Sequence, residues 1–335
     1  MSKYVKSKNV SQSTTVDLVV PVFNEEKCLP FFWQRVNSLA LKHSKYSWNF
    51  IFINDGSTDG TTDFLEKLSK QNKRVSVIKF SRNFGHQAAI TAGLDFSTSK
   101  NVCVIDADLQ DPPELLIKML SALNRGYNIA YGLRTHREGE SVFKIVTAKL
   151  FYRILSIITE VEIPVDTGDF RVMDRKVVTA LCSMREKHRF IRGMVAWSGF
   201  RSKAIPYERE ARLVGITKYP FRKMLKFALD AIYSFSDWPL RVATMIGSLI
   251  GSFGFLGIFY ILWEAFFNKN YLPGSSASLF AILAIGGVQL LCLGFIGQYI
   301  GRIFNECKKR PLYLVDSILN KKAIYSETVK KQEIR

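Results

Sequence analysis

Two long stretches without a charged residue lie near the C-terminal end of this 335-residue chain and constrain its fold most strongly. The first covers residues 242–263, which as a helix with a rise of 1.5 Å per residue would span about 33 Å. The second covers residues 270–301, with Pro273 and Gly274 marking a turn before its apolar part. Because the hydrocarbon core of a bilayer is about 30 Å thick, the pattern predicts two transmembrane helices that form a hairpin.

The residues within and beside these stretches predict how the hairpin is oriented and packed. Glycines recur in both stretches, and small residues permit close helix approach and self-association into a homo-oligomer. Segments 201–226 and 302–335 are rich in Lys and Arg, whereas the connecting loop holds one basic residue, Lys269. Since positive flanks favour the cytoplasmic side, we expect a multi-pass protein of the inner (plasma) membrane with both termini cytoplasmic.

The net charge of the chain favours anionic partners. Lys and Arg number 47 against 29 Asp and Glu, a balance of +18 that suits nucleic acid, lipid head groups or nucleotide phosphates. Much of this charge flanks the apolar stretches, so an anionic leaflet explains it and nucleic acid is not expected. The five cysteines form no CxxC pair, which excludes a zinc ribbon and argues against a disulfide framework. No apolar stretch follows the first lysines, so a signal peptide is not expected.

Strand-like and helix-like runs alternate along the first 133 residues. Strand-like runs occur at 16–22, 49–54, 75–80, 101–106 and 128–133, with helical patterns near 59–71, 85–97 and 113–125. This order predicts an α/β fold with a mostly parallel sheet covered on both faces. Ligands of such sheets bind outside the carboxyl ends of the strands. No GxGxxG or GxxxxGK[ST] pattern occurs, so neither a dinucleotide site nor a P-loop is supported.

Asp106-Ala107-Asp108, at the end of the fourth strand-like run, is the strongest chemical feature of the sequence. The two carboxylates can turn toward one point beyond the sheet edge, and Gln110 can add a carbonyl oxygen. Oxygen ligands of this kind suit Mg²⁺ or Mn²⁺ held jointly with substrate phosphates. The alternative is a turn in which Asp108 or Asp111 caps the helix that starts at the following prolines.

Five segments, taken in order, resemble the inverting family 2 glycosyltransferases of the GT-A fold: VVPVFNEE, NDGSTDGT, SRNFGHQAAITAGLD, DADLQDPPE and VDTGDFRVMDR. Within that family the chain resembles the polyprenyl-phosphate glycosyltransferases, which include bactoprenol glucosyltransferases and dolichyl-phosphate mannose synthases. The resemblance covers residues 14–235, and a two-helix hairpin is typical of the bacterial and phage members. It implies an enzyme, a hexosyltransferase with a Rossmann-like GT-A domain.

The resemblance also implies a reaction. One sugar passes from a nucleotide-sugar to a polyprenyl (undecaprenyl) phosphate on the cytoplasmic face, which supplies a donor for cell-envelope glycan modification. UDP-glucose is favoured by analogy. N-acetylglucosamine, galactose, amino-arabinose and mannose donors remain open.

The matching motifs carry expected roles. The nucleotide-sugar site is assigned to Pro21, Phe23, Glu25, Asp55 and Asp106, with Asp55 accepting a hydrogen bond from the base. The metal set is Asp106, Asp108 and Gln110. Three cations are assigned to phosphate: Arg134 as a catalytic arginine, and Arg134, Arg212 and Lys218 at the acceptor phosphate. The plain alternatives are a strand end or turn for the first group, and a solvated or lipid-facing cation for the last.

Asp166 and Asp169 have the least certain role among the predicted catalytic residues. A phosphate monoester carries about −1.5 to −2 charges at pH 7, so this acceptor needs little deprotonation. The carboxylates are therefore in doubt as general bases and could instead orient Arg171 or sugar hydroxyls. Asp169 is preferred as the site residue, and a structural role suits Asp166 equally well.

The predicted domain organisation has five parts. Residues 1–13 are a flexible N-terminus, 14–218 a cytoplasmic GT-A domain, 219–238 an interfacial helix, 239–303 two transmembrane helices, and 304–335 a cytoplasmic tail. Residues 143–158 and 219–238 read as interfacial amphipathic helices, with a core-facing helix as the alternative. Segment 135–141 is expected to close over the acceptor site. The run 311–315 predicts a strand added to a neighbouring subunit.

Two other functions compete with this interpretation. A processive polysaccharide synthase would carry a Gln-x-x-Arg-Trp motif, which is absent. A membrane-tethered scaffold that binds a nucleotide-sugar without turnover would be favoured if a metal carboxylate were missing, and both are present. The four histidines show no metal-ligand spacing, so none is assigned to the site.

Overall fold

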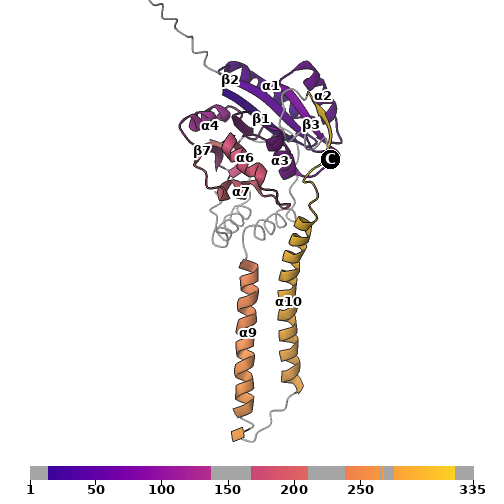
Figure 1. Cartoon of the computed structure of the whole chain (residues 1–335), viewed down its shortest axis with the longest axis vertical. Helices are drawn as coiled ribbons and strands as arrows, with labels where there is room; N and C mark the ends of the chain where they lie inside the picture. The colour runs from indigo at the N-terminus through magenta and orange to yellow at the C-terminus, as the bar shows by residue number, and fades with distance from the viewer. Residues whose placement is uncertain (1–13, 137–166, 210–237, 264–265, 268–274, 321–335) are drawn as a thin grey trace, which may run out of the picture. The chain divides into compact units, whose positions relative to one another are not determined.

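The computed structural model describes residues 14–136, 167–209, 238–263, 266–267 and 275–320 (Figure 1). It divides into two compact units. The first contains an eight-stranded sheet with its helices, and the second contains the two long helices of the C-terminal part. The predicted segments 1–13 and 143–158 lie outside the described residues, as does 219–238 except for its last residue.

The sheet of the first unit is mostly parallel, as predicted. Its strand order is β7-β5-β6-β4-β1-β2-β3-β8. Six strands share one direction: β1 (Thr14–Val22), β2 (Tyr46–Asn54), β3 (Val75–Phe80), β4 (Asn101–Val104), β5 (Ile129–His136) and β7 (Ser202–Glu208). Two strands run the opposite way: β6 (Thr167–Asp174) and β8 (Val315–Leu319). This is the GT-A-like α/β architecture that the sequence predicts.

The described helices of the first unit alternate with the strands. They are α1 (Leu29–Lys42), α2 (Thr61–Gln71), α3 (His86–Phe96), α4 (Leu115–Asn124), α6 (Arg175–Ser183) and α7 (Ile191–Trp197). Helix α1 was missed by the sequence analysis. Its buried residues Leu29, Phe32, Val36 and Leu39 recur at helical spacing, and this spacing could have predicted the helix from the sequence.

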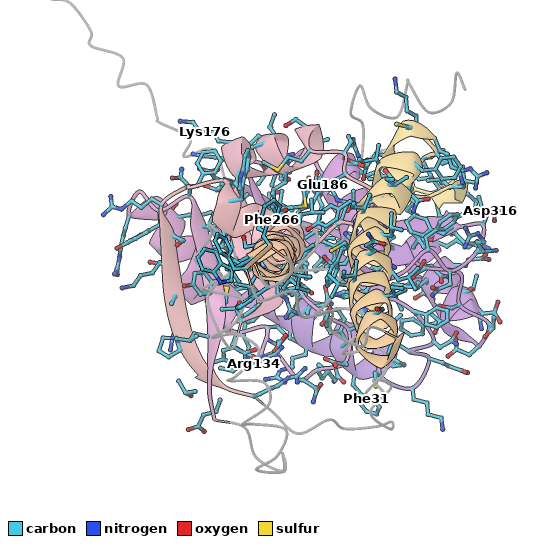
Figure 2. The ribbon with its side chains drawn as sticks, turned by 90° about the horizontal axis from the view of Figure 1, so that it is seen from below. Phe31, Arg134, Lys176, Glu186, Phe266 and Asp316 are labelled. Carbon is cyan, nitrogen blue, oxygen red and sulfur yellow. The ribbon has the colours of Figure 1, made fainter. Side chains whose placement is uncertain are left out.

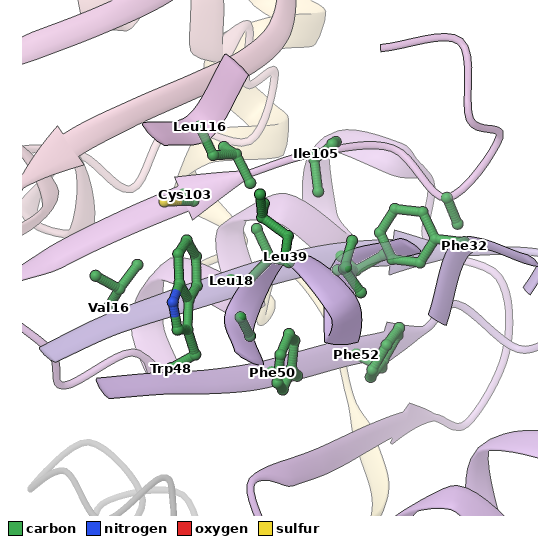
Figure 3. Close-up of a cluster of buried hydrophobic side chains, with 14 of the residues drawn as sticks. Val16, Leu18, Phe32, Leu39, Trp48, Phe50, Phe52, Cys103, Ile105 and Leu116 are labelled. Carbon is green, nitrogen blue, oxygen red and sulfur yellow. The ribbon is translucent and has the colours of Figure 1, made fainter. Parts of the chain in front are cut away.

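The core cluster lies between the sheet and helices α1, α2 and α4 (Figure 3). Residues 16, 18, 19, 20 and 22 of β1 are all buried, as expected for a central parallel strand covered on both faces. Phe50 and Phe52 of β2 are fully buried, and the Trp33 ring meets Phe50 edge to face at 5.0 Å. Burying one such side chain stabilises a fold by about 1.5–3 kcal/mol, so this cluster holds the sheet that carries the strand-end loops.

The register of β6 matters most for the site. β6 pairs antiparallel with β4, with Val104 opposite Arg171. Continuing that register by two residues brings Asp169 opposite Asp106. Two carboxylates that are far apart in the chain therefore meet at the carboxyl edge of the parallel strands.

The predicted C-terminal strand forms, but not where it was expected. It covers Val315–Leu319 rather than 311–315, and it pairs with β3 of the same chain, not with a neighbouring subunit. In Figure 1 it is the yellow strand beside β3, and Asp316 of this strand is labelled in Figure 2. An open edge strand exposes unpaired backbone groups, and β8 covers that edge of β3.

The second unit contains α9 (Trp238–Trp263) and α10 (Ser275–Cys307), which lie side by side (Figure 1). The Cys292 Sγ on α10 lies 3.7 Å from the Ala243 carbonyl oxygen on α9. Residues 242–263 and 275–301 of the two apolar stretches are therefore helical. Within the described residues, one segment, Ile285–Cys307, is long and apolar enough to cross a membrane, judged by length and composition.

At the glycines of α9 and α10 whose surroundings the structure describes, the predicted close approach of the two helices is not seen. A Cβ added at any of six glycines of α9 and α10 would meet no atom within 4 Å: Gly247, Gly286, Gly287, Gly294, Gly297 and Gly301. These glycines therefore do not let the two helices of one chain approach each other, because they do not lie between them.

Candidate active site

The loops that follow β1 and β2 form one side of the candidate site. The Asn24 amide donates to Ser57 Oγ at 3.0 Å, and the Glu25 amide donates to Thr61 Oγ1 at 3.0 Å. Pro21 is buried in β1, and Phe23 beyond it is 38% exposed. The structure thus brings the predicted nucleotide-site residues of the first loop against the loop that carries Asp55.

Asp55 is buried and organises the neighbouring loop. Its carboxylate accepts the Phe84 amide at 2.7 Å and the Gly85 amide at 3.0 Å. Burial raises the pKa of Asp55, and these two hydrogen bonds oppose that rise. A Cβ at Gly56, which has φ +68°, would lie 2.5 Å from the Arg82 carbonyl carbon, so only glycine permits this close approach. The predicted contact of Asp55 with a base stays a prediction.

Asp106 is half-buried at the end of β4 and is under-satisfied. Its Oδ1 is buried and has no hydrogen-bond partner in the described structure, while His86 Nε2 lies 3.6 Å away. Burial raises the pKa of Asp106 to about 6, with His86 opposing the rise and Asp108 adding to it. Buried polar atoms in native proteins are rarely left without a partner. This oxygen is therefore suited to be a ligand of a divalent cation.

Asp108 and Gln110 lie in the same turn. Asp108 Oδ1 accepts the Gln110 amide at 3.2 Å. The turn of the alternative interpretation is present, but neither Asp108 nor Asp111 caps α4, because the N-cap residue is Glu114. The described residues contain no group of three or more His, Cys, Asp or Glu that could hold a metal. Two carboxylates then suit a cation such as Mg²⁺, which keeps waters and takes further oxygens from substrate phosphates.

Asp169 is the opposite case, a buried and fully satisfied carboxylate. Arg192 donates to it through Nε at 3.1 Å and Nη2 at 3.2 Å, and His86 Nε2 lies 3.2 Å from Oδ2. Burial by itself would raise the pKa of Asp169, but Arg192 and His86 more than offset it and hold the pKa well below its usual range. Such a carboxylate is a poor proton acceptor, which disfavours a general base and fits an orienting role.

Arg171, the predicted partner of Asp169, is buried on the same strand. Its Nη2 lies 3.7 Å from Asp169 Oδ1 and donates to the Gly168 carbonyl at 2.9 Å. Burial lowers the pKa of Arg171 to about 10, with Asp169 opposing the fall. Asp169 therefore contacts Arg171 as proposed, but Arg192 is its closer cation.

His86 and Arg192 are the site residues that sequence reasoning missed. His86 begins α3 and bridges Asp106 and Asp169; burial would lower its pKa, but these two carboxylates raise it to about 9. The available signal was its place directly after a strand-end loop, which a search for metal-ligand spacing ignores. Arg192 lies on α7, and only the tertiary fold brings it to Asp169.

Arg134, which is labelled in Figure 2, is held by a second buried carboxylate, that of Asp111. Its Nε donates to Tyr207 Oη at 3.1 Å, and its Nη2 lies 3.6 Å from Asp111 Oδ1. Tyr207 Oη also donates to Asp111 Oδ1, and Arg209 Nε lies 3.9 Å from the same Asp111 oxygen. Arg134 is thus a fixed cation, and its predicted contact with phosphate stays a prediction. Asp166, Arg212 and Lys218, like most of the segment 135–141, lie outside the described residues.

Comparisons with known proteins identify the family of the chain. Residues 17–181 match the model of "Glycosyl transferase family 2". An uncharacterized glycosyltransferase of Bacillus subtilis, YkcC, is 46% identical over 306 residues, 91% of this chain and 94% of its own. The bactoprenol glucosyl transferase of Shigella phage SfX is 37% identical over 302 residues, 90% of this chain and 99% of its own.

Solved structures are more distant. The glucosyl-3-phosphoglycerate synthase of Mycobacterium tuberculosis, in complex with Mn²⁺, UDP-glucose and phosphoglyceric acid, is 17% identical with a TM-score of 0.46, covering 65% of this chain and 77% of that one. The sequence relatives, by contrast, match nearly end to end at identities well above 30%. The chain therefore belongs to glycosyl transferase family 2, as a hexosyltransferase in the group that includes the bactoprenol glucosyl transferases.

Proposed function

We propose that this protein transfers one sugar, with inversion, from a nucleotide-sugar to a polyprenyl phosphate at the cytoplasmic face of the membrane. A phosphate oxygen of the lipid attacks the anomeric carbon, the bond from that carbon to the diphosphate breaks, and a nucleoside diphosphate leaves. The product is a polyprenyl-phosphate sugar that serves as a donor for cell-envelope glycans. UDP-glucose is the favoured donor, since several relatives bear the name bactoprenol glucosyl transferase.

The observation that carries the proposal is the buried oxygen of Asp106 at the strand edge, which has no hydrogen-bond partner in the described structure. Asp106 and Asp108, with Gln110 beside them, would hold Mg²⁺ or Mn²⁺. The bound cation would offset the negative charge that develops on the departing diphosphate. Asp55 and the exposed Phe23 lie on the two loops that adjoin this edge, where a base and ribose would lie.

The second part of the support is that no strong general base is needed. A phosphate acceptor already carries a nucleophilic oxygen. The side chains of Arg192 and His86 contact Asp169 and lower its pKa. Asp169 then keeps His86 and Arg192 in place beside the donor. Arg134, anchored by Asp111, is positioned to contact phosphate together with Arg212 and Lys218. This division fits catalysis by positioning and electrostatics.

The membrane part of the proposal uses α9 and α10. Both helices carry large exposed apolar side chains, including Leu249, Phe253, Leu293 and Ile300, which a bilayer would cover. We propose that both cross the membrane as a hairpin, with both termini on the cytoplasmic side, so that the GT-A domain meets its lipid acceptor there.

The test is a transfer assay with membranes that contain the protein. A nucleotide donor with a radiolabelled sugar should yield an organic-extractable, mild-acid-labile lipid, and a panel of UDP- and GDP-sugars identifies the donor. Asp108→Ala should abolish the product, whereas Asp63→Ala, an exposed carboxylate on α2, should not. Binding of a nucleotide-sugar without transfer from any donor would instead favour the non-catalytic scaffold.

A further inference from the structure

The segment that follows α10 places one buried tyrosine against the GT-A domain. Tyr313 is 4% exposed, and its ring stacks on Phe80 with centroids 5.0 Å apart and planes 12° apart. Its hydroxyl donates to Asp95 Oδ2 at 2.8 Å. Phe80 ends β3 and Asp95 lies near the end of α3, so Tyr313 holds both ends of the segment 80–95.

The segment held in this way contains the residues that shape the donor site. Phe84 packs edge to face on Phe80 at 5.7 Å, and the Phe84 amide donates to Asp55 at 2.7 Å. Two residues later, His86 contacts both Asp169 and Asp106. A displacement of Phe80 or α3 would therefore change the position of the Asp55 loop and of His86 together.

The rest of the tail makes contacts that keep Tyr313 in place. The Ser81 amide donates to the Leu314 carbonyl at 3.1 Å, and β8 continues along β3 as far as Leu319. The side chain of Asn320 then donates to the Lys73 and Val75 carbonyls at 2.8 and 2.9 Å. Residues 313–320 thus contact the edge strand from β3's start to its end, which is far more than one surface contact.

We infer that Tyr313 is a positioning residue of the donor site, which couples the tail after α10 to Asp55 and His86 through Phe80, Phe84 and α3. The tail is then part of the catalytic unit. Its kinetic consequences rest on the proposed function, because they concern binding of the nucleotide-sugar. The part of the inference that says Tyr313 holds residues 80–86 in their conformation does not depend on any substrate.

The first experiment measures steady-state transfer by full-length Tyr313→Ala. Loss of the ring removes the stacking on Phe80, so donor KM should rise about three- to tenfold while kcat stays within about twofold. Tyr313→Phe keeps the ring, and Asp95 keeps both hydrogen bonds from Arg185, so its donor KM should stay within about twofold. Leu314→Ala, whose exposed side chain is 52% accessible, is the matched control and should behave as the unchanged protein.

The second experiment tests the route. If Tyr313 acts through Phe84, the double variant Tyr313→Ala/Phe84→Ala should raise donor KM no more than Phe84→Ala does. Effects that simply multiply would show that the tyrosine acts independently of Phe84 and would overturn the inference. Should Tyr313→Ala not fold, Tyr313→Leu retains apolar volume without a stacking face and takes its place.

The third experiment needs no substrate. Amide hydrogen exchange at Phe84 and Gly85, both bonded to Asp55, should be about tenfold faster in Tyr313→Ala than in Leu314→Ala. Unchanged exchange and unchanged KM, accompanied only by a lower melting temperature, would show a merely structural tyrosine. Absence of sugar transfer by the unchanged protein would count against the proposed function, whereas unchanged exchange would count against this inference.

Discussion

Asp106 and Asp169 both lie near His86 at one edge of the sheet, yet the rest of their surroundings differ. Asp106 is half-buried, has one oxygen without a hydrogen-bond partner, and has a pKa raised to about 6. Asp169 is 4% exposed, contacts Arg192 and His86, and has a depressed pKa. The difference teaches that two aspartates at the same sheet edge can differ in pKa because different numbers of hydrogen-bond donors surround them, and this contrast underlies the two roles proposed for them.

The largest expected effect is on the under-satisfied side of the comparison. Asp106→Asn should lower kcat/KM at least about 10³-fold, because it removes a charge at the point where the proposed reaction releases a diphosphate. The melting temperature without divalent cation should stay the same or rise, since a buried charge with a raised pKa is removed. Transfer assays and calorimetry measure both, with Asp63→Asn as the exposed control. A variant that keeps a tenth of the activity would show that Asp106 is not a metal ligand.

On the satisfied side, Asp169→Asn should reduce both stability and rate. It leaves Arg192 and His86 without their carboxylate, and breaking a buried pair costs about 3–5 kcal/mol of unfolding free energy. The rate should fall about 10²-fold through misplacement of those cations. Urea unfolding with Asp174→Asn as control checks this, because Asp174 of the same strand caps α6 and Asn is also a good cap. Equal losses of unfolding free energy in Asp106→Asn and Asp169→Asn would remove the distinction between the two carboxylates.

The stability difference between the unchanged protein and Asp169→Asn should depend on pH. The folded-state pKa of Asp169 lies below its ordinary value of 3.8, so the unfolded chain takes up its proton first as the pH falls. The stabilisation from Asp169 is therefore fully present above about pH 4 and is lost as the pH drops through the folded-state pKa. Urea unfolding from pH 7 to pH 3 measures it, and Asp63→Asn should show no such trend. A gap that grows on acidification would contradict the depressed pKa.

The smallest expected effect concerns Asp111, a third carboxylate that resembles Asp169. Tyr207→Phe removes the hydroxyl that donates to Asp111 and accepts from Arg134, which should cost about 1–2 kcal/mol of unfolding free energy. The KM for polyprenyl phosphate should rise a few-fold, because Arg134 is less fixed. Tyr127→Phe, whose ring lies under Arg201, is the control. An unchanged acceptor KM would separate Arg134 from the acceptor phosphate.

Much of the fold could be predicted because its signals are local. The third strand was placed at 75–80, where β3 lies, and the helices before and after it were placed within a few residues. Strand-end loops meet at one edge in any parallel sheet, so Asp55 and Asp106 were predicted to share a site. Both C-terminal helices follow from uncharged runs of sufficient length. The spacing of apolar and charged residues is sufficient to predict these helices and strands, because it is a property of residues that are close together in the chain.

The tertiary structure alone decided which groups surround each carboxylate. The sequence around Asp169 does not predict its contacts with Arg192 and His86, because antiparallel pairing of β6 with β4 and packing of α7 create those contacts. The tail is a similar case: the run after residue 310 predicts a strand, but only the free edge of β3 and the ring of Phe80 determine where it binds. Sequence by itself determined the family, the parallel sheet and the carboxylates at its edge. Their protonation and their roles depend on distances between remote segments, since burial and charge interactions act through space and not along the chain.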